Sequence, residues 1–478
     1  MSKEWIINEI EGVNLGDKRL EKRLAETLET LSGSSDKSIT HAVKGRAERE
    51  AIYRFISNPN VSFEKILAPH HLQTEIRAQK EPVVLFVQDT TEINLTRPQQ
   101  QVQGAGPLQS ENTKRFGCFI HSLQAYTPQG IPLGCYWEKN WTRDINNKTG
   151  IARIKELQHL PIDKKESFRW LEGFRKTGQF AQRNLDVTTV CIGDSESDIF
   201  TVLVEPRQSP NHHLIVRGCH NRSIESTDPS LRHIREQVSS TPPLATLQIT
   251  ARARVSKTSV EIHPRKESRE QRDATVLVHA TSVTLKAPAK CKNVPQTMSL
   301  NVVLVKEENP PDEETPIEWI LLTTLPIQTI EEVIRVIDYY RVRWQIEIFF
   351  RVLKQGCLVE KRRFETIERI YNCLSLYMLI SWHIIYLCYM SRYKGEMSCE
   401  FLFERSEWKP VVTLRNKKGP TIEIPPTLGE FMLMIAELGG YKNRKSPPGV
   451  ETIWKGLRDV TIMAECWDTF GPEARAST

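Results

Sequence analysis

The stretch "PVVLFVQD", residues 82–89, is a run of mostly apolar side chains that ends in a carboxylate. A short run rich in β-branched residues is typical of a strand that is covered on both faces of its sheet. A second run, "DVTTVCIGD" at residues 186–194, also ends in an acid. Open sheets place their active crevices at the carboxyl ends of strands, so Asp89 and Asp194 are candidate site residues. Each acid alone is equally compatible with a turn that ends a strand.

The sequence around these two runs predicts the rest of an α/β domain. "CFIHSLQAY" and "IPLGCYWE" are strand-like and are separated by "TPQG", a turn sequence at residues 127–130. "HHLIVRG", residues 212–218, is a fifth strand candidate. Helical patterns cover residues 165–176 and 197–205. Three successive strands followed by alternating helices and strands predict a mixed five-stranded sheet that is flanked by helices.

The remaining sequence predicts helical regions at both ends and a β-rich insertion. Residues 1–76 carry apolar side chains at helical spacing. Between about residues 221 and 318, short strand-like pieces alternate with proline and charged residues. We therefore expect a helical domain at 1–76, an α/β domain at 77–390 with its insertion at about 221–318, and a helical domain at 391–478.

The composition restricts the class of protein only moderately. The chain has 478 residues and a formal net charge of +6, a mildly basic balance that weakly indicates a polyanionic partner. The ten cysteines contain no C-x-x-C pair and the first residues contain no secretory signal, so reduced thiols and a cytoplasmic location are expected. Residues 373–390 are apolar enough to raise the question of a membrane span, but their polar interruptions favour a buried core helix and no membrane partner.

A third candidate acid lies in "YRVRWQIEIFFRVLK", residues 340–354, within a predicted helix that begins near residue 329. At about 100° per residue, Tyr340, Arg343, Glu347 and Lys354 fall within an arc of about 60°. One interpretation is a solvated helix surface with an Arg343–Glu347 ion pair. The other is a metal site, because carboxylates bind Mg²⁺ and two such ions about 4 Å apart support phosphodiester transfer.

The spacing of these four residues, Y-x₂-R-x₃-E-x₆-K, resembles the signature of a known family. It is similar to that of the bacterial cut-and-paste DDE transposases of the insertion-sequence-four family, the transposon-five-like group. The similarity extends over nearly the whole chain. It includes "YRFISNPNVS", "QDTTEINL", "GDSESDI", "IVRGCHNR", "ETPIEWILLTT" and, near the end, "IAELGGY".

The resemblance implies a ribonuclease-H-like catalytic core. It further implies that Asp89, Asp194 and Glu347 are catalytic residues that bind two Mg²⁺ ions, for which Mn²⁺ can substitute. The implied activity is DNA transposition by hydrolysis, hairpin formation and strand transfer. The implied partners are double-stranded DNA, as transposon ends and as target, and a second copy of the chain in a synaptic complex. The setting would be the bacterial cytoplasm, at the nucleoid.

The resemblance also implies DNA contacts. Tyr340, Arg343 and Lys354 would bind the backbone of the transposon end. Trp319 matches the family tryptophan that stacks on a flipped base, and Arg217 matches a strand arginine near that base. Trp319 is also compatible with a core position at a strand start, and each basic residue of the N-terminal region with a solvated helix charge. The candidate contacts in that region are Arg19, Arg23 and Arg54.

Two other functions stay open. A ribonuclease-H-like DNA endonuclease would use the same metal chemistry but would give linear cuts without hairpins. A non-catalytic DNA-binding regulator or inhibitor of transposition would bind DNA ends without cutting them. The presence of the N-terminal segment and of all three acids argues against the regulator.

Overall fold

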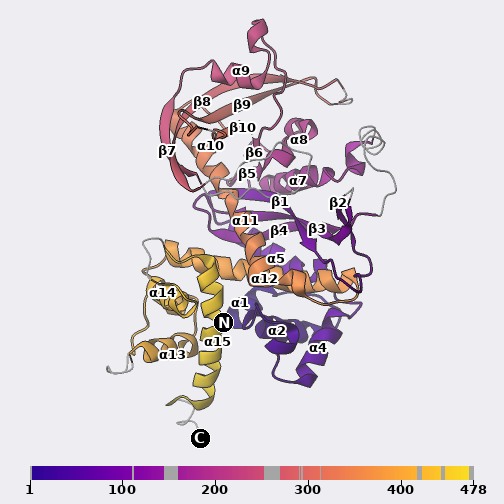
Figure 1. Ribbon diagram of the computed structural model, residues 1–478, viewed down its shortest axis with the longest axis vertical. Helices are drawn as coiled ribbons and strands as arrows, with labels where there is room; N and C mark the ends of the chain where they lie inside the picture. The colour runs from indigo at the N-terminus through magenta and orange to yellow at the C-terminus, as the bar shows by residue number, and fades with distance from the viewer. Residues whose placement is uncertain are drawn as a thin grey trace. The chain divides into compact units, whose positions relative to one another are not determined.

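The computed structural model describes residues 3–109, 112–144, 160–251, 270–289, 291, 294–312, 314–416, 423–442 and 447–472 (Figure 1). The chain divides into two compact units. Unit 1 comprises Met1–Glu81, Thr90–His159 and Trp344–Thr478, and unit 2 comprises Pro82–Asp89 and Leu160–Arg343.

Unit 2 is built on a mixed sheet with the strand order β1-β5-β6-β10-β9-β8-β7. β1, β5 and β6 pair in parallel, whereas β6, β10, β9, β8 and β7 pair in antiparallel succession. The first part of β1, through Asp89, belongs to this unit. The bounds are β1 (Val83–Asn94), β5 (Thr188–Gly193), β6 (His212–Arg217), β7 (Ala245–Ala251), β8 (Arg272–Lys286), β9 (Thr297–Glu307) and β10 (Glu318–Thr323).

The strands of the expected insertion belong to the same sheet as the expected core strands. The expectation of a mixed sheet flanked by helices is confirmed, but a sheet of five strands was too small. β10 pairs with β6 in the register Leu321↔Arg217, and β9 then pairs with β10. Pairing with β10 satisfies the backbone groups along one edge of β6, so the sheet continues from the core into the insertion.

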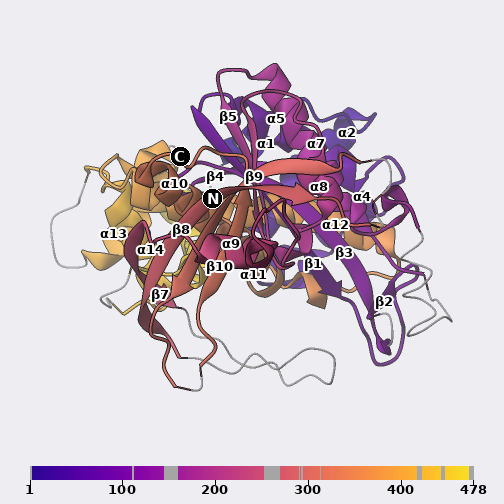
Figure 2. The ribbon, with the colours of Figure 1, turned by 90° about the horizontal axis from the view of Figure 1, so that it is seen from above.

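Helices cover this sheet and complete one hydrophobic core. Phe174 of α7, Leu203 of α8 and Val238 of α9 are buried in one cluster with Leu214 of β6 and Val302 of β9. α9 packs on β8 and β9 (Figure 2). The same cluster therefore joins the α/β part to the strands of the insertion. The helical elements of unit 2 are η1 (Ile162–Lys164), α7 (Phe168–Arg183), η2 (Ser195–Ser197), α8 (Phe200–Val204), η3 (Pro229–Leu231), α9 (Ile234–Ser239) and α10 (Ile330–Val342).

Unit 1 contains helices from both ends of the chain and a small meander of strands. β3 pairs with β2 and with β4 in antiparallel fashion. Its helices are α1 (Lys3–Glu9), α2 (Lys18–Ser32), α3 (Ile39–Ala42), α4 (Arg46–Ile56), α5 (Phe63–Ala78), α11 (Trp344–Arg351), α12 (Ile367–Tyr393), α13 (Arg405–Arg415), α14 (Leu428–Leu438) and α15 (Val450–Phe470). Its shorter helical elements and strands are η4 (Val352–Gly356), η5 (Val359–Lys361), η6 (Cys399–Phe401), β2 (Gly106–Gln109), β3 (Asn112–Tyr126) and β4 (Pro132–Trp141).

The long helix α12 is the core helix of unit 1. It packs against α2, α4, α5, α14, α15 and β4. The Asn372 amide donates to the carbonyls of Ile56 and Val61, both at 3.0 Å, and Trp382 Nε1 donates to the Pro132 carbonyl at 3.2 Å. α12 therefore connects the N-terminal helices with the C-terminal helices.

α12 is also the one helix among the described residues that is long and apolar enough to cross a membrane. This is weak evidence for a span, because 89% of its most apolar stretch is buried inside the structure. Its buried polar side chains, such as Asn372 and Ser381, contact protein groups. These contacts match the interpretation of α12 as a buried core helix.

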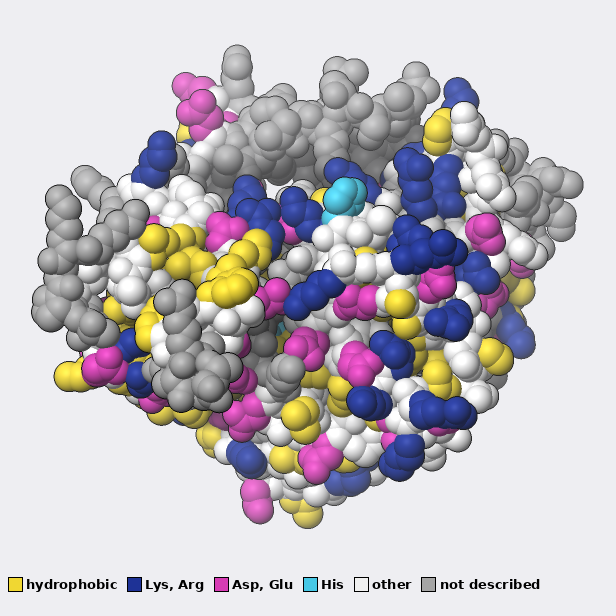
Figure 3. Space-filling view, turned by 90° about the horizontal axis from the view of Figure 1, so that it is seen from below, with side chains coloured by type: hydrophobic (Ala, Val, Ile, Leu, Met, Phe, Trp, Pro, Cys, Tyr) yellow, Lys and Arg dark blue, Asp and Glu magenta, His cyan; other side chains and the backbone are white. Residues whose placement is uncertain are grey.

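The surface of unit 1 separates basic from hydrophobic side chains. Figure 3 shows lysine and arginine side chains gathered on one side of the face seen from below, the side on which Figure 1 places α2 and α4. Hydrophobic side chains gather on the other side, where Figure 1 places α13 and α15. On α15, Ile462 is 54% exposed and Phe470 is 70% exposed. Unit 1 therefore presents a charged surface, in which Asp and Glu side chains lie among the Lys and Arg side chains, and an apolar surface from different helices.

Candidate active site

The pairing of β1 with β5 brings two of the predicted acids together. The parallel register includes Val87↔Ile192, and two further residues along each strand place Asp89 beside Asp194. Neighbouring strands lie about 4.8 Å apart, so the two side chains lie close together. Asp194 directly follows β5, as expected, but Asp89 lies within β1, which continues to Asn94, so the expectation that Asp89 ends its strand is wrong. Asp89 is buried and Asp194 is half-buried. Two carboxylates thus lie where an open sheet forms its crevice.

Local packing fixes the turn that carries Asp194. Asp194 Oδ1 accepts a hydrogen bond from Glu196 N at 2.8 Å, and Ser197 Oγ donates to the Asp194 carbonyl at 2.6 Å. At Gly193, a Cβ atom would lie only 2.3 Å from Ser197 Oγ. The close approach of Ser197 therefore requires glycine before Asp194, and the sequence "GD" holds the carboxylate at the strand end.

Arg343 pairs with the first of these acids. Arg343 Nη1 lies 3.2 Å from Asp89 Oδ2, and the two side chains are 14% and 12% exposed. Arg343 is the C-cap residue that directly follows α10. Two residues that are 254 positions apart in the sequence thus form a largely buried ion pair beside β1.

Tyr340 and Trp319 lie in the same unit as this pair. Their ring centroids are 6.1 Å apart with an interplanar angle of 59°. Burial raises the pKa of the Tyr340 phenol, Arg343 and Arg217 oppose this rise, and Asp194 adds to it. Tyr340 therefore lies within electrostatic reach of both arginines and of one of the acids.

Arg217 is close to Trp319 because β6 and β10 are neighbours. Its guanidinium donates from Nη2 to the Glu318 carbonyl at 3.4 Å, and both Arg217 and Trp319 are half-buried. Trp319 is thus a partly accessible ring at the start of β10. The sequence was also compatible with a fully buried core position for this residue. The arrangement gathers cationic and aromatic side chains near Asp89 and Asp194.

The third acid, Glu347, lies in unit 1, on α11, where it is half-buried. The expected continuous helix to residue 354 is wrong. α10 ends at Val342, α11 covers Trp344–Arg351, and Lys354 lies in the π-helical turn η4. A π turn contains more residues than an α turn, so the arc of about 60° calculated at about 100° per residue does not extend to Lys354.

The backbone after this turn is also unusual. Leu358 has a φ of 50°, the one positive φ of a non-glycine residue within the described ranges. π turns and unusual backbone conformations are frequent at functional sites. The segment that carries Glu347 and Lys354 is therefore irregular where the sequence predicts a plain amphipathic helix.

The candidate DNA contacts of the N-terminal helices are accessible. The Arg19 side chain is 89% exposed and pairs with Asp17 at 2.9 Å, and Arg23 pairs with Glu26 at 2.7 Å. Arg54 is exposed on α4. Exposed ion pairs are worth little, so these guanidinium groups can exchange their partners for phosphates at small cost.

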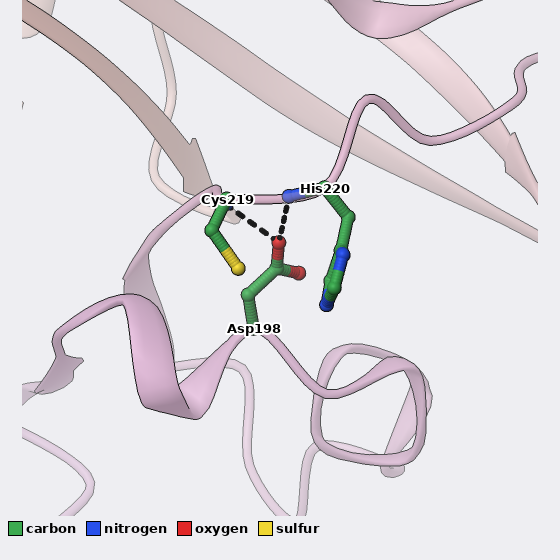
Figure 4. Close-up of side chains that lie close together, drawn as sticks. All are labelled: Asp198, Cys219 and His220. Atoms are coloured by element: carbon green, nitrogen blue, oxygen red, sulfur yellow. Dashed lines mark hydrogen bonds between the residues drawn. The ribbon is translucent and has the colours of Figure 1, made fainter. Parts of the chain in front are cut away.

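A separate cluster of Asp198, Cys219 and His220 has its potential ligand atoms within 4.8 Å of one another (Figure 4). Asp198 Oδ2 accepts hydrogen bonds from the backbone N–H groups of Cys219 and His220, at 2.8 and 2.9 Å. Asp198 Oδ1 accepts from Arg222 Nε and Nη2, at 2.8 and 2.6 Å. Burial and the Asp198 charge raise the pKa of the Cys219 thiol, which opposes the thiolate that a metal needs.

These four hydrogen bonds use the acceptor capacity of the Asp198 carboxylate. The cluster therefore has the character of a structural tie. The sequence pattern alone did not indicate this cluster. The one sequence signal was Arg222 in "IVRGCHNR", since a buried acid such as Asp198 needs a charged partner.

The chemistry of the donors on β1 and after β5 suits a hard divalent cation. Asp89 and Asp194 supply carboxylate oxygens, which Mg²⁺ and similar ions prefer. Among the described residues, all ten cysteines are free thiols, and none of them lies next to these acids in the sequence. The site therefore fits a hard, oxygen-bound metal better than a soft, thiolate-bound one.

Family models match three parts of the chain. A model described as "Transposase DNA-binding" matches residues 2–61. A "Transposase DDE domain" model matches residues 167–382, and a "Transposase Tn5 dimerisation domain" model matches residues 379–470. The second match includes Asp194 and Glu347 but begins after Asp89. With the mixed sheet, it confirms the expected α/β, ribonuclease-H-like fold class.

Proposed function

Because this chain belongs to the Tn5-like DDE transposases, DNA-cleaving and strand-transferring enzymes that bind DNA and dimerise, we propose that it performs cut-and-paste transposition of an insertion sequence. The observation that supports the proposal is the parallel register of β1 and β5, which, continued two residues beyond Val87↔Ile192, brings Asp89 beside Asp194. We assign end recognition to residues 1–76, catalysis to 77–390 and dimerisation to 391–478.

A DDE domain depends on divalent metal ions. We assign two Mg²⁺ ions, with Mn²⁺ as a substitute, to Asp89, Asp194 and Glu347. When bound, such ions activate a water or a 3′-hydroxyl and stabilise the leaving oxygen. The chain contributes two donors on neighbouring strands, Asp89 within β1 and Asp194 directly after β5, so their separation is set by the sheet.

The residues around the acids bind and orient the DNA. The Arg343 guanidinium can grip a phosphate with two parallel hydrogen bonds, and Lys354 supplies a point charge. Tyr340 lies beside Trp319, which offers part of its ring to an unstacked base. Stacking of this kind offsets the cost of taking a base out of the duplex. Arg217 lies near the same ring and contacts the flipped nucleotide.

The proposed sequence of steps begins with hydrolysis of one strand at the transposon end. The freed 3′-hydroxyl attacks the opposite strand and gives a hairpin, the hairpin is opened by hydrolysis, and the 3′ ends join to target DNA. A homodimer holds two ends in a synaptic complex, and the exposed basic residues Arg19, Arg23 and Arg54 contact the end sequence. The reaction takes place in the bacterial cytoplasm, at the nucleoid.

The test is a cleavage assay with DNA that carries the native flanking repeats, with and without Mg²⁺. Hairpin-ended excised fragments are expected from the natural chain. Asp89→Ala, Asp194→Ala and Glu347→Ala should each abolish them. Asp338→Ala is the matched control, because Asp338 is an exposed acid on α10 that pairs with Arg341.

The other outcomes select the competing functions. Linear cuts without hairpins would identify an endonuclease, and DNA binding without cleavage would identify a regulator. Normal cleavage by Asp89→Ala or Glu347→Ala would refute the assignment of the acids.

A further inference from the structure

We propose that Asp198 is a positioning residue that ties the turn carrying Asp194 to the end of β6, and that it is not a metal ligand. The inference rests on the proposed function, since it concerns how the residues of that site are held. The hydrogen bonds that form the tie can be tested without any reaction.

The tie is made by one carboxylate that bridges two segments. Asp198 follows η2, four residues after Asp194, and it accepts the backbone N–H groups of Cys219 and His220 just beyond β6 (Figure 4). Arg222 closes the arrangement: its guanidinium donates to Asp198 Oδ1 and also, from Nη2, to the Asp198 carbonyl at 2.6 Å. β5 and β6 are neighbouring parallel strands, so the tie closes the gap between their carboxyl ends.

Burial makes this tie strong. The Asp198 side chain has no exposure, and that of Arg222 is 9% exposed. The Arg222 guanidinium also lies 5.9 Å from the ring centre of Phe200, a residue of the main hydrophobic cluster. Charge-assisted hydrogen bonds between buried groups are stronger than neutral ones, and solvent screens them less.

The two segments that the tie joins both carry proposed site residues. On one side, Asp194 is held by Gly193 and Ser197 within the same short turn as Asp198. On the other side, Arg217 is the last residue of β6, two residues before Cys219. If the tie loosens, the carboxylate and the arginine lose their fixed separation while both remain present.

The same contacts explain why Asp198 does not serve as a ligand. Both of its oxygens already accept two hydrogen bonds, one pair from backbone N–H groups and one pair from a cation. A metal would have to displace Arg222 from a buried carboxylate and would lie next to its positive charge.

The test compares Asp198→Asn with a matched control. The asparagine keeps the size of the side chain but cannot accept hydrogen bonds through its NH₂ group, so two of the four bonds are lost. Arg222→Lys is the second variant, which keeps the charge and loses the two-pronged contact. Glu196→Gln is the control, because Glu196 lies in the same turn with a side chain that is 62% exposed.

The expected result for Asp198→Asn is a kcat for end cleavage lowered by roughly 10- to 100-fold, with the KM for end DNA and the Mn²⁺ affinity changed by less than about threefold. The backbone amides of Cys219 and His220 should exchange with D₂O faster than in the natural chain. Glu196→Gln should change none of these quantities. If Asp198→Asn does not fold, Arg222→Lys is used for the same measurements.

Each alternative result has a separate meaning. Unchanged exchange at Cys219 and His220 would overturn the tie, and faster exchange with normal kcat would overturn its role in positioning. A fall in Mn²⁺ affinity as large as that caused by Asp194→Asn would make Asp198 a ligand. If the natural chain cleaves no end DNA, the proposed function fails, while the exchange measurement still tests the tie.

Discussion

At the scale of single residues, the Asp89–Arg343 pair links two roles that the site needs. The Asp89 carboxylate is a proposed metal ligand, and Arg343 is a proposed phosphate ligand, yet the two bind each other at 3.2 Å. A metal ion and a guanidinium compete for the same oxygen, and a phosphate competes with that oxygen for the guanidinium. DNA binding and metal binding should therefore favour each other.

This competition predicts the behaviour of Arg343→Ala without DNA. Removal of the guanidinium should raise the affinity of the chain for Mn²⁺ by about threefold to tenfold, because the carboxylate no longer has a resident cation. Titration followed by electron paramagnetic resonance of free Mn²⁺ measures this. Arg341→Ala is the control, since Arg341 is 61% exposed and pairs with Asp338. An equal or weaker Mn²⁺ affinity in Arg343→Ala would contradict the competition.

A second prediction at this scale concerns acid stability and rests on a buried network in unit 1. His70 Nδ1 lies 2.5 Å from Glu9 Oε2, and its Nε2 accepts a hydrogen bond from Cys135 N. Burial lowers the pKa of His70. Burial also raises the pKa of Glu9, but His70 and Arg77 outweigh it and bring that pKa to about 2. Both groups bind protons more readily in the unfolded chain than in the folded one.

Stability should therefore fall as the pH falls. The His70 contribution is present above the unfolded pKa of about 6.5 and is lost below it, and the Glu9 contribution is lost from about pH 4.5 towards its folded pKa. Calorimetry from pH 7 to pH 3 should show a decreasing Tm. Glu9→Gln should flatten the curve below about pH 4.5. A Tm that is constant over this range would contradict the assignment.

At the scale of elements, strands were easier to predict than the helix that carries the third acid. The runs at 82–89 and 186–194 predict strands because they are short and rich in β-branched residues, as strands covered on both faces of a sheet usually are. The helix calculation assumed a constant angle per residue. The spacing of apolar residues over residues 329–354 reveals neither the end of α10 at Val342 nor the π turn η4. The arc calculated at a constant angle per residue therefore does not describe the position of Lys354.

The core helix α12 gives a prediction at the same scale. Asn372→Ala removes both hydrogen bonds to the carbonyls of Ile56 and Val61 and leaves two acceptors buried, which should cost about 2–3 kcal/mol in the free energy of unfolding. Ser391→Ala on the same helix is the control, because Ser391 bonds only its own helix, at the Cys388 carbonyl. Urea unfolding measures both variants. Equal stability of the two would show that Asn372 is not a connector.

At the scale of the whole molecule, the partner of each strand was the least predictable feature. β-branched runs in the insertion predict strands, but not that β10 pairs with β6 or that β9 pairs with β10. Such pairings depend on which edge is open after the core has formed, and this information is spread over segments far apart in the sequence. The same holds for the Asp89–Arg343 and Asp198–Arg222 pairs. Asp89 and Asp194 were candidates because they end strand-like runs, and Glu347 was a candidate because of its helix face. Their assignment to one catalytic site came only from the family resemblance.

The apolar surface of α15 gives the prediction for assembly. Ile462→Asp places a charge on an exposed hydrophobic side chain within the dimerisation match and should raise the dimer dissociation constant by roughly tenfold or more. Sedimentation velocity measures the change. Ile7→Asp on α1, where Ile7 is 61% exposed, is the control and should leave the dimer intact. An unchanged dissociation constant for Ile462→Asp would show that the dimer interface does not include Ile462.

The accessibility of the cysteines allows binding at the proposed site to be followed by thiol alkylation. Cys219, just beyond β6, and Cys466, on α15, are exposed, whereas Cys118, Cys135 and Cys191 are buried. A maleimide should therefore modify Cys219 long before these three. Since Cys219 lies two residues from Arg217, DNA seated at the strand ends should slow its alkylation. The rate at which one natural side chain is labelled would then report occupancy of the site in the unaltered protein.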